Sequence, residues 1–346
     1  MRIALDATYS VGDSLSGVGV YSNALLDGLA ASHREASFDF CYRPHRLLRS
    51  FRRTLPPNCH RRLLTESRIP LRAELFHGLN QRLPCRADLR RAVTTFHDLF
   101  ILSGDYSTPE FRRRFAGQAR EAAKRSDAII AVSSFTASQV RDLLDVDSAR
   151  IRVVHHGVKK VDGPVPPVSG REKMILHVGA IQRRKNVLRL VEAFERIGSG
   201  WSLVLAGSIG YGGEEILERV RNSPRRESIK VTGYADEAAL RDLYLRAAVF
   251  AFPSLDEGFG LPVLEAMAAG MPVLTSNRGA LPEVSGDAAL AVDPSSVEAI
   301  ADGLCKLTAD EGLREAMASR GLARSALFTW EEAVRRTWEV YEEISP

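Results

Sequence analysis

Short apolar runs alternate with longer amphipathic stretches along the 346 residues of the chain. The short runs are rich in β-branched and aromatic residues, as in AVTTF at 92–96 and AIIAV at 128–132. Because parallel strands are buried on both faces and are joined by helices, this alternation predicts an α/β fold with parallel sheets. Strands are expected at residues 2–6, 38–42, 74–77, 92–96, 128–132 and 151–154, and then at 174–178, 202–206, 229–232, 249–252, 272–275 and 290–292.

A segment that fits neither period separates the two groups of strands. Residues 159–170 contain three prolines and two glycines, which continue neither a helix nor a strand. We therefore expect a linker here, between an N-terminal domain at 1–165 and a C-terminal domain at 171–327. Residues 328–346 predict a helix that must pack on another element, with Thr329 as its N-cap and an apolar face of Trp330, Val334, Trp338 and Tyr341.

The composition is that of an ordinary globular protein, with 45% hydrophobic and 26% charged residues. Collagen-like, disordered and disulfide-scaffold classes are therefore excluded. No apolar run approaches the roughly 18 residues of a spanning helix, and the start is typical of a strand rather than a signal peptide, so a cytoplasmic protein is expected. The cysteines, Cys41, Cys59, Cys85 and Cys305, lack the spacing of a zinc site or a disulfide framework.

The formal net charge of +4 is unevenly distributed along the chain. Residues 1–165 hold 26 Lys and Arg against 17 Asp and Glu, whereas the remainder holds 21 against 26. Nine arginines lie between Arg43 and Arg72, where Glu66 is the single acid. The two halves of the chain are therefore expected to meet different partners.

Within this arginine-rich segment, residues 46–53 predict an amphipathic helix. Leu47, Leu48 and Phe51 would share one face, and guanidinium groups the other. That pattern suits an anionic membrane surface. A solvated basic helix without a lipid role is the alternative.

Residues 252–270 carry the most informative chemistry. A strand is expected to end near Phe252, and Pro262 and Gly270 are typical of the first turn and the C-terminal cap of the next helix. The intervening residues 257–261 (EGFGL) are therefore a strand-to-helix loop. Its two glycines allow a tight turn and present N–H groups at a helix N-terminus, which suits a phosphate group.

Two glutamates flank this loop. Glu257 projects from the loop, and Glu265 lies one turn inside the helix. An acid on each side of a phosphate site can accept hydrogen bonds from hydroxyls of two different sugars. Taken alone, the pair is also compatible with a glycine turn followed by a glutamate that favours the helix dipole.

This segment resembles the E-x7-E signature of the family 4 retaining glycosyltransferases, which have the GT-B fold. Further segments resemble the same family in the same order along nearly the whole chain. They lie at residues 17–21 (GVGVY), 95–99 (TFHDL) with 109–110 (PE), 129–136 (IIAVSSFT), 177–179 (HVG) through 183–186 (RRKN), and 276–284 (SNRGALPEV) followed by 286–289 (GDAA).

The resemblance implies two facing Rossmann-like domains with parallel sheets, the N-terminal one binding the acceptor and the C-terminal one the nucleotide sugar, with the last helix crossing back to the N-terminal domain. It implies a metal-independent hexosyltransferase that retains anomeric configuration and needs no cofactor. His97, Lys185 and Glu257 would be the catalytic residues. The donor-binding residues would be Gly17, Gly19, Arg183, Arg184, Gly258, Phe259, Gly260, Leu261 and Glu265.

The family also implies a role for each group. Lys185 and an adjacent arginine would hold the donor diphosphate, where negative charge grows as the glycosidic bond breaks. Glu257 would contact hydroxyls of the donor sugar, Glu265 the ribose, and the amides of residues 259–261 the phosphates. His97 would reach the sugar from the N-terminal domain, and the glycine loop at 17–21 would approach the substrate closely.

One position departs from the family. Many relatives carry an arginine where this chain has Ala180, as a second phosphate ligand. That role must pass to Arg183 or Arg184. The position beside Lys185 favours Arg184, but the sequence leaves the direction of both side chains open.

Three patterns suggest other chemistry. The D-x-D pattern at 145–147 resembles a manganese motif of another glycosyltransferase fold, but its position predicts a solvated loop. The glycines at 17–19 with Asp39 match half of a dinucleotide fingerprint, whose third glycine is replaced by Ser22. The histidines at 155–156 have no further metal ligand at suitable spacing and are expected at the hinge.

The donor and acceptor follow from the resemblance only in outline. The RKN-type loop favours GDP-mannose, with a UDP-hexose as the alternative donor. A catalytically silent nucleotide-sugar-binding protein is another alternative, and a glycogen phosphorylase-like activity is disfavoured because no pyridoxal-phosphate lysine segment is present. The expected acceptor is a glycan or lipid-linked acceptor at the inner membrane face, approached through residues 43–72, and no nucleic acid is expected as a partner.

Overall fold

The computed structural model describes residues 1–12, 15–67, 69, 72–161 and 163–345. The chain forms two compact units. The first comprises Met1–Gly157 and Thr329–Pro346, and the second comprises Val158–Phe328. The chain thus passes between the units twice, once directly after Gly157 and once directly after Phe328. The sequence predicted a linker slightly later, over residues 159–170, and a C-terminal helical domain from residue 328.

The first unit is built on a seven-stranded parallel sheet of order β3-β2-β1-β4-β5-β6-β7. Its strands are β1 (Arg2–Asp6), β2 (Ser37–Tyr42), β3 (Cys59–Leu63), β4 (Leu75–Gly78), β5 (Ala92–Phe96), β6 (Ala128–Ala131) and β7 (Ile151–Val153). Its helices are α1 (Gly17–Ser32), α2 (Pro44–Ser50), α3 (Phe100–Ser103), α4 (Pro109–Arg125), α5 (Ser134–Leu144) and α13 (Trp330–Ile344).

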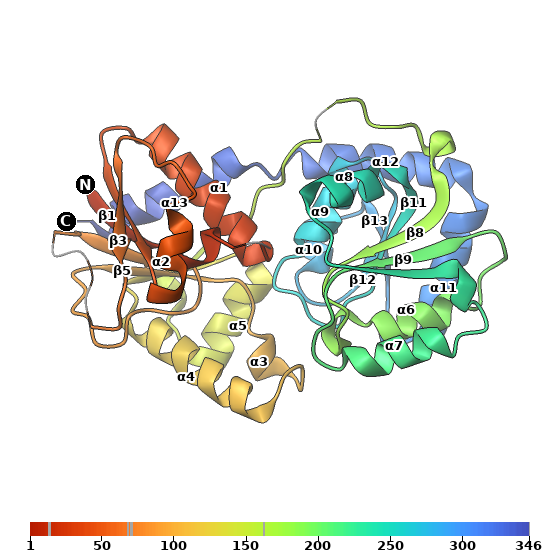
Figure 1. Ribbon diagram of the computed structural model, residues 1–346, viewed down its shortest axis with the longest axis horizontal. Helices are drawn as coiled ribbons and strands as arrows, with labels where there is room; N and C mark the ends of the chain where they lie inside the picture. The colour runs from red at the N-terminus through yellow and green to blue at the C-terminus, as the bar shows by residue number, and fades with distance from the viewer. Residues whose placement is uncertain (13–14, 68, 70–71, 162, 346) are drawn as a thin grey trace. The chain divides into compact units, whose positions relative to one another are not determined.

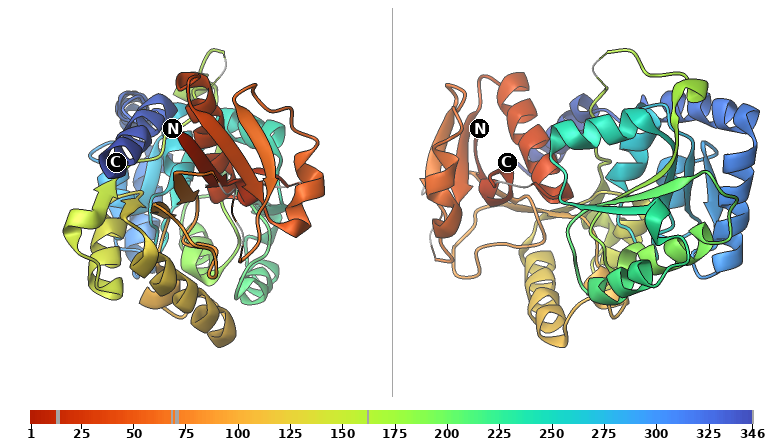
Figure 2. Two further views of the ribbon diagram at one scale, coloured as in Figure 1. Left: turned by 90° about the vertical axis from the view of Figure 1, so that its left-hand side faces the viewer. Right: turned by 45° about the vertical axis from the view of Figure 1, so that its right-hand side comes forward.

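Alternating strand residues supply two helix-covered faces of this sheet. On β1, Ile3 and Leu5 belong to a core shared with α1 and α13, whereas Ala4 belongs to a core shared with α4 and α5. Figures 1 and 2 show α1 and α13 side by side on one face. This period of two is what a sheet buried on both faces requires.

Helix α13 completes the core of the first unit. Thr329 caps it by accepting a hydrogen bond from the Glu332 amide. Val334 and Tyr341 are buried against α1 and the sheet, and Gly28 of α1 leaves room for Val334, because a Cβ there would collide with it. The expected apolar face of this helix therefore packs within the first unit.

The second unit contains a six-stranded parallel sheet of order β10-β9-β8-β11-β12-β13. Figure 1 shows α6, α7 and α11 along one face and α8, α9 and α12 along the other. The strands are β8 (Glu172–Val178), β9 (Ser202–Ala206), β10 (Ile229–Gly233), β11 (Ala247–Phe252), β12 (Val273–Ser276) and β13 (Ala289–Val292). The helices are α6 (Val187–Phe194), α7 (Gly213–Arg221), α8 (Glu237–Arg246), α9 (Leu261–Ala268), α10 (Leu281–Ser285), α11 (Val297–Ala309) and α12 (Glu311–Ser325).

The α/β fold with parallel sheets is confirmed, and all expected strands are present with ends that differ by at most two residues. One strand, β3, was not predicted. It is an edge strand in which only Cys59 is buried. Because exposed residues such as His60 and Arg62 are polar or charged, the sequence lacks the alternation of apolar and polar residues that marks a strand. Charged residues are common on edge strands because they discourage pairing with another chain.

The arginine-rich segment also differs from the predicted amphipathic helix. Helix α2 ends at Ser50, and Leu47 packs against the core rather than beside Leu48. Leu48 and Phe51 are exposed, by 83% and 64% of their surfaces. The predicted apolar face is therefore divided between the interior and the surface. None of the described helices has the length and apolar composition that a bilayer crossing requires.

Candidate functional site

The E-x7-E segment forms a tight loop between β11 and α9, as the sequence predicts. Gly260 lies directly before the first residue of α9 with φ of +106°, a value that favours glycine. A Cβ at Gly260 would lie 2.6 Å from Leu281 Cδ2. Both backbone freedom and close packing therefore require glycine at this helix N-terminus.

Glu257 is the centre of a buried charged cluster. Its Oε1 accepts hydrogen bonds from Lys185 Nζ at 2.5 Å and from Ser254 Oγ at 2.6 Å. Its Oε2 lies 3.2 Å from Arg184 Nη1. Burial by itself raises the pKa of Glu257, but the positive charges of Arg184 and Lys185 outweigh burial and lower the pKa to about 2. The cluster therefore holds one carboxylate between two cations.

Asn186 joins the two loops that form this cluster. It adopts a left-handed conformation with φ of 58°, and its side-chain amide donates to the carbonyls of Pro253 and Pro294 at 2.9 and 2.7 Å. The bond to Pro253 holds the turn that carries Lys185 against the loop that carries Glu257, and the bond to Pro294 ties the same turn to the segment after β13. The sequence marked Asn186 as part of the RKN motif but gave no indication of these partners.

The two candidate phosphate-binding arginines point in different directions. Arg183 is half exposed and forms an ion pair with Glu215 of α7 at 2.9 Å. Arg184 is buried and donates to the Asp256 carbonyl at 2.6 Å, beside Glu257. The structure therefore places Arg184, rather than Arg183, in the cluster with Lys185 and Glu257.

The partner of Glu265 is a neutral hydroxyl rather than a cation. Glu265 accepts a hydrogen bond from Tyr244 Oη to its Oε2 at 2.8 Å. Burial raises the pKa of Glu265, although the Tyr244 hydrogen bond partly opposes this effect. Sequence reasoning missed Tyr244, because it lies 21 residues away in α8.

The other residues of this loop offer a ligand their backbone amides rather than their side chains. The ring of Phe259 is buried and packs edge to face on Phe328 at 6.0 Å between centroids, and Leu261 is also buried. Gly258 precedes Phe259 in the same loop. The side chains of Phe259 and Leu261 therefore stabilise the loop, and the backbone amides of the loop remain the groups suited to a phosphate.

His97 lies directly after β5 in the first unit, at the carboxyl end of the strand. It is 9% exposed, and its Nε2 lies 2.9 Å from the Leu79 carbonyl oxygen. Its Nδ1 lies 3.3 Å from His156 Nε2. Burial lowers the pKa of His97 to about 4, so the ring is neutral at neutral pH.

The expected glycine loop at 17–21 is a helix. Gly17 is the first residue of α1, and Gly19 lies in its first turn. A Cβ at Gly19 would lie 2.9 Å from the Tyr9 carbonyl oxygen. Gly19 therefore allows the helix to pack on the preceding turn, which is a structural reason for glycine that the resemblance did not include.

Two patterns that suggested other chemistry have structural roles. Asp39 is fully buried in β2 and pairs with Arg2 at 2.7 Å and with Arg62 at 3.0 Å, so it does not face a ribose. Asp145 ends α5 in a left-handed conformation, and Asp147 accepts from the Ala149 amide at 2.9 Å. Within the described ranges, no group of three His, Cys, Asp or Glu side chains is placed to hold a metal ion.

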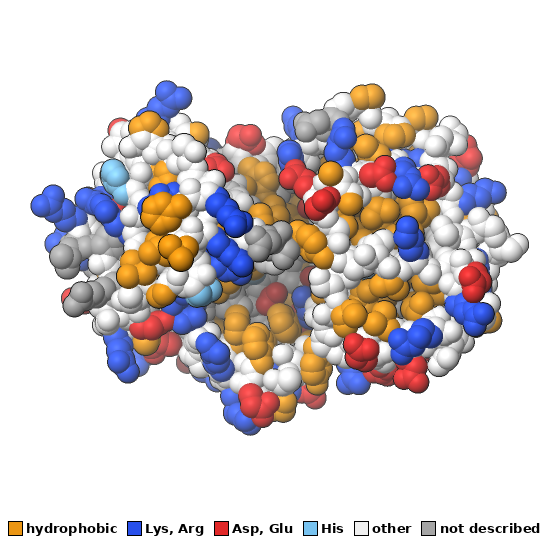
Figure 3. Space-filling model, in the orientation of Figure 1, with side chains coloured by type: hydrophobic (Ala, Val, Ile, Leu, Met, Phe, Trp, Pro, Cys, Tyr) orange, Lys and Arg blue, Asp and Glu red, His pale blue; other side chains and the backbone are white. Residues whose placement is uncertain are grey.

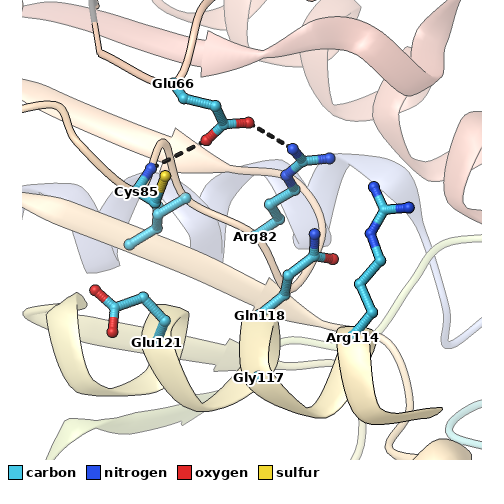
Figure 4. A pocket seen from close by; sticks show the side chains of 8 residues that line it. Glu66, Arg82, Cys85, Arg114, Gly117, Gln118 and Glu121 are labelled. Carbon is cyan, nitrogen blue, oxygen red and sulfur yellow. Dashed lines mark hydrogen bonds and ion pairs between the residues drawn. The ribbon is translucent and has the colours of Figure 1, made fainter. Parts of the chain in front are cut away.

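A hollow of about 450 Å³ lies in the first unit between α4 and the segment that follows β4. Figure 4 shows Arg82, Arg114 and Gln118 directed toward it. Glu66 accepts hydrogen bonds from Arg82 Nη2 at 2.5 Å and from the Cys85 amide at 3.1 Å. The hollow contains none of the site residues that the sequence predicted.

Comparison with known proteins identifies the same family for both units. The family model "Glycosyl transferases group 1" matches residues 161–324, and "Glycosyltransferase Family 4" matches residues 16–160. The chain is 33% identical over 283 residues to O-antigen chain mannosyltransferase B of Escherichia coli, which covers 78% of this chain and 74% of that protein. It is 30% identical over 263 residues to the serotype-specific mannosyltransferase WbdA of Escherichia coli, covering 69% of this chain but only 32% of WbdA.

Solved structures show the same fold at lower sequence identity. Sucrose-phosphate synthase from Thermosynechococcus elongatus superposes with a TM-score of 0.80 at 21% identity, covering 99% of each chain. Anabaena HepE in complex with UDP and glucose superposes with a TM-score of 0.77 at 15% identity, covering 99% of this chain and all of HepE. These similarities extend to both units of the chain.

Proposed function

The chain belongs to the group 1 glycosyltransferases, has their GT-B fold, and we propose that it transfers mannose from GDP-mannose to a glycan or lipid-linked acceptor. The observation that carries this proposal is the 33% identity to an O-antigen chain mannosyltransferase, together with the Lys185–Glu257 cluster. A UDP-hexose is the alternative donor, because the HepE structure contains UDP and glucose.

In this proposal, Lys185 and Arg184 bind the donor diphosphate. The two cations and Glu257 carry a net charge of +1 in a buried setting, where a fixed charge stabilises developing negative charge more strongly than it does in water. As the bond between C1 of the sugar and the diphosphate breaks, the acceptor oxygen bonds to C1. Its proton passes to a phosphate oxygen of the leaving GDP, so GDP and the extended glycan are the products.

The remaining residues orient the donor. Glu257 stays ionised and accepts hydrogen bonds from sugar hydroxyls, while Glu265 accepts from the ribose. The backbone amides around Gly260 bind the phosphates at the N-terminus of α9. His97 keeps its proposed catalytic role, and the reaction requires neither a metal nor another cofactor, because the two cations neutralise the phosphates.

Calorimetric titration with GDP, UDP and ADP in metal-free buffer tests the donor site. We expect saturable GDP binding that Lys185→Ala and Arg184→Ala abolish. Arg183→Ala is the matched control, because its guanidinium pairs with Glu215 outside the cluster. Binding of UDP instead of GDP would establish the alternative donor, and equal losses in all three variants would refute the placement of the diphosphate.

We also propose that the arginine-rich segment binds an anionic membrane surface, where a lipid-linked acceptor would be found. Leu48 and Phe51 are exposed and adjoin Arg49 and Arg52 in the sequence, and Figure 3 shows apolar and basic side chains next to one another over α2. Exposed apolar groups beside cations bind an anionic bilayer by insertion and by charge together.

Flotation with phosphatidylglycerol vesicles at physiological salt tests this surface. Arg46, Arg49 and Arg52 to Gln, combined with Leu48→Ser and Phe51→Ser, should reduce the bound fraction at least tenfold. Arg226→Gln with Leu327→Ser changes exposed residues of the second unit and should leave binding unchanged. Unchanged binding of the first variant would refute the proposal.

A further inference from the structure

The two adjacent histidines that follow β7 have different environments. His155 is partly exposed, whereas His156 is buried with only 4% of its surface exposed. His156 Nε2 lies 3.3 Å from Nδ1 of His97. The structure thus brings one member of the expected hinge pair against a predicted catalytic residue 59 positions earlier in the chain.

The direction of this hydrogen bond follows from the partner on the other side of His97. The Leu79 carbonyl oxygen can only accept, so His97 Nε2 must carry the hydrogen at 2.9 Å. The buried ring is neutral, and its Nδ1 therefore has a lone pair. His156 Nε2 must then donate, which gives a one-way chain from His156 to His97 to the Leu79 carbonyl.

Aromatic packing fixes both rings. The Tyr21 ring of α1 lies 4.8 Å from His97, edge to face, and 4.8 Å from His156. Trp330, the first residue of α13, lies 5.8 Å from His156. Gly157 allows the backbone after His156 to lie directly against Trp330, because a Cβ there would collide with the Trp330 amide. Two helices therefore hold the donor of the hydrogen bond in place.

We propose that His156 is a positioning residue for His97: its Nε2–H fixes the His97 ring and keeps Nδ1 unprotonated. This inference rests on the proposed function only for the role of His97 at the donor sugar. A ring held from both nitrogens keeps one orientation and one tautomer. Loss of the His156 donor would leave a buried lone pair without its partner and would remove one of the two hydrogen bonds that orient the ring.

Nuclear magnetic resonance of protein with nitrogen-15-labelled histidine tests the hydrogen bond without any substrate. We expect a scalar coupling between His156 Nε2 and His97 Nδ1, with the hydrogen on Nε2 of both rings. A hydrogen on His97 Nδ1, or the absence of coupling together with unchanged His97 signals in His156→Phe, would overturn the inference. Because no donor is added, this result is independent of the donor's identity.

Kinetics with the nucleotide sugar supply the functional part of the test. His156→Phe keeps an aromatic ring but loses the donor, and it should lower kcat/KM about tenfold through a misplaced His97 ring. His156→Gln keeps an N–H donor and should restore at least a third of the wild-type value. His155→Gln is the adjacent control and should match the wild type. Equal values for His156→Phe and His156→Gln, at equal thermal stability, would refute the positioning role.

Discussion

The Lys185–Glu257 cluster of the second unit and the His97–His156 pair of the first are both buried, yet burial leads to opposite protonation states. Two cations keep Glu257 ionised and lower its pKa to about 2. His97 is surrounded by a carbonyl, a second imidazole and a phenol ring, and burial lowers its pKa to about 4. Burial favours the neutral form unless opposite charge is buried with the group. The neighbours, rather than the depth of burial, determine which chemistry each cluster can perform.

The largest effect is expected when the charged cluster loses its acid. Glu257→Gln leaves Lys185 and Arg184 buried without a carboxylate between them, which costs about 3–5 kcal/mol of unfolding free energy. Transfer should fall at least a hundredfold, since the sugar contact and the positions of both cations are lost. Urea unfolding and a transfer assay measure the two losses, and a folded variant that retains turnover would place the donor elsewhere.

The buried neutral histidines of the first unit should instead lower the unfolding free energy in mild acid. The pKa of His97 is about 4 and that of His77 about 3, because both are buried, against 6.5 in an unfolded chain. Between pH 6.5 and 4 the unfolded chain binds protons that the folded chain does not, so stability falls as pH falls, by about 3 kcal/mol at pH 4 for His97 alone. Glu257 contributes to the loss of stability only at lower pH, between about pH 4.5 and pH 2.

Urea unfolding between pH 7.5 and 4 measures this dependence. His97→Gln should reduce the slope of unfolding free energy against pH by about 1.4 kcal/mol per unit. Glu257→Gln should leave the slope above pH 5 unchanged. The same slope in the wild type and in His97→Gln would show that His97 is not held neutral.

Two tyrosines allow the same chemical change to be made in each unit. Tyr341 Oη lies 2.6 Å from His77 Nδ1, inside the neutral network of the first unit. Tyr341→Phe leaves that buried nitrogen without its partner, and we expect a loss of about 1–3 kcal/mol of stability. GDP affinity should not change, which differential scanning calorimetry and titration with GDP can establish.

The smallest effect is expected from the matching change in the second unit. Tyr244→Phe removes the hydrogen bond that orients Glu265, and GDP affinity should fall about fivefold, corresponding to about 1 kcal/mol. Stability should fall less than in Tyr341→Phe. A larger loss of GDP affinity in Tyr341→Phe than in Tyr244→Phe would contradict the placement of the nucleotide site in the second unit.

The sequence predicts most of the fold because hydrophobic period is a local property. Buried strands such as β5 and β11 are short apolar runs between turn residues, and their ends are predicted closely. The edge strand β3 is not predictable in this way, because exposed residues such as His60 and Arg62 carry no hydrophobic period. Arg43, which begins the arginine-rich segment, is buried against Asp6 at 3.5 Å, a pairing that basic composition alone does not reveal.

The site is predictable to the extent that its groups lie in one motif. The loop with Glu257 and Gly260 is local, and its structure agrees with the sequence. The contact between Lys185 and Glu257 spans 72 residues, and that between His97 and His156 spans 59. Such contacts depend on which strand ends meet at the edge of a sheet, and single-sequence patterns carry no information about that pairing.

The path of the chain has a consequence for biosynthesis. The second unit is one uninterrupted stretch, Val158–Phe328, so a ribosome delivers all of it before α13 exists. The core of the first unit requires Val334 and Tyr341 from that helix. The part of the protein that is translated first therefore completes its folding last, with the α1 face uncovered throughout synthesis of the second unit. That interval is when a nascent chain needs a chaperone.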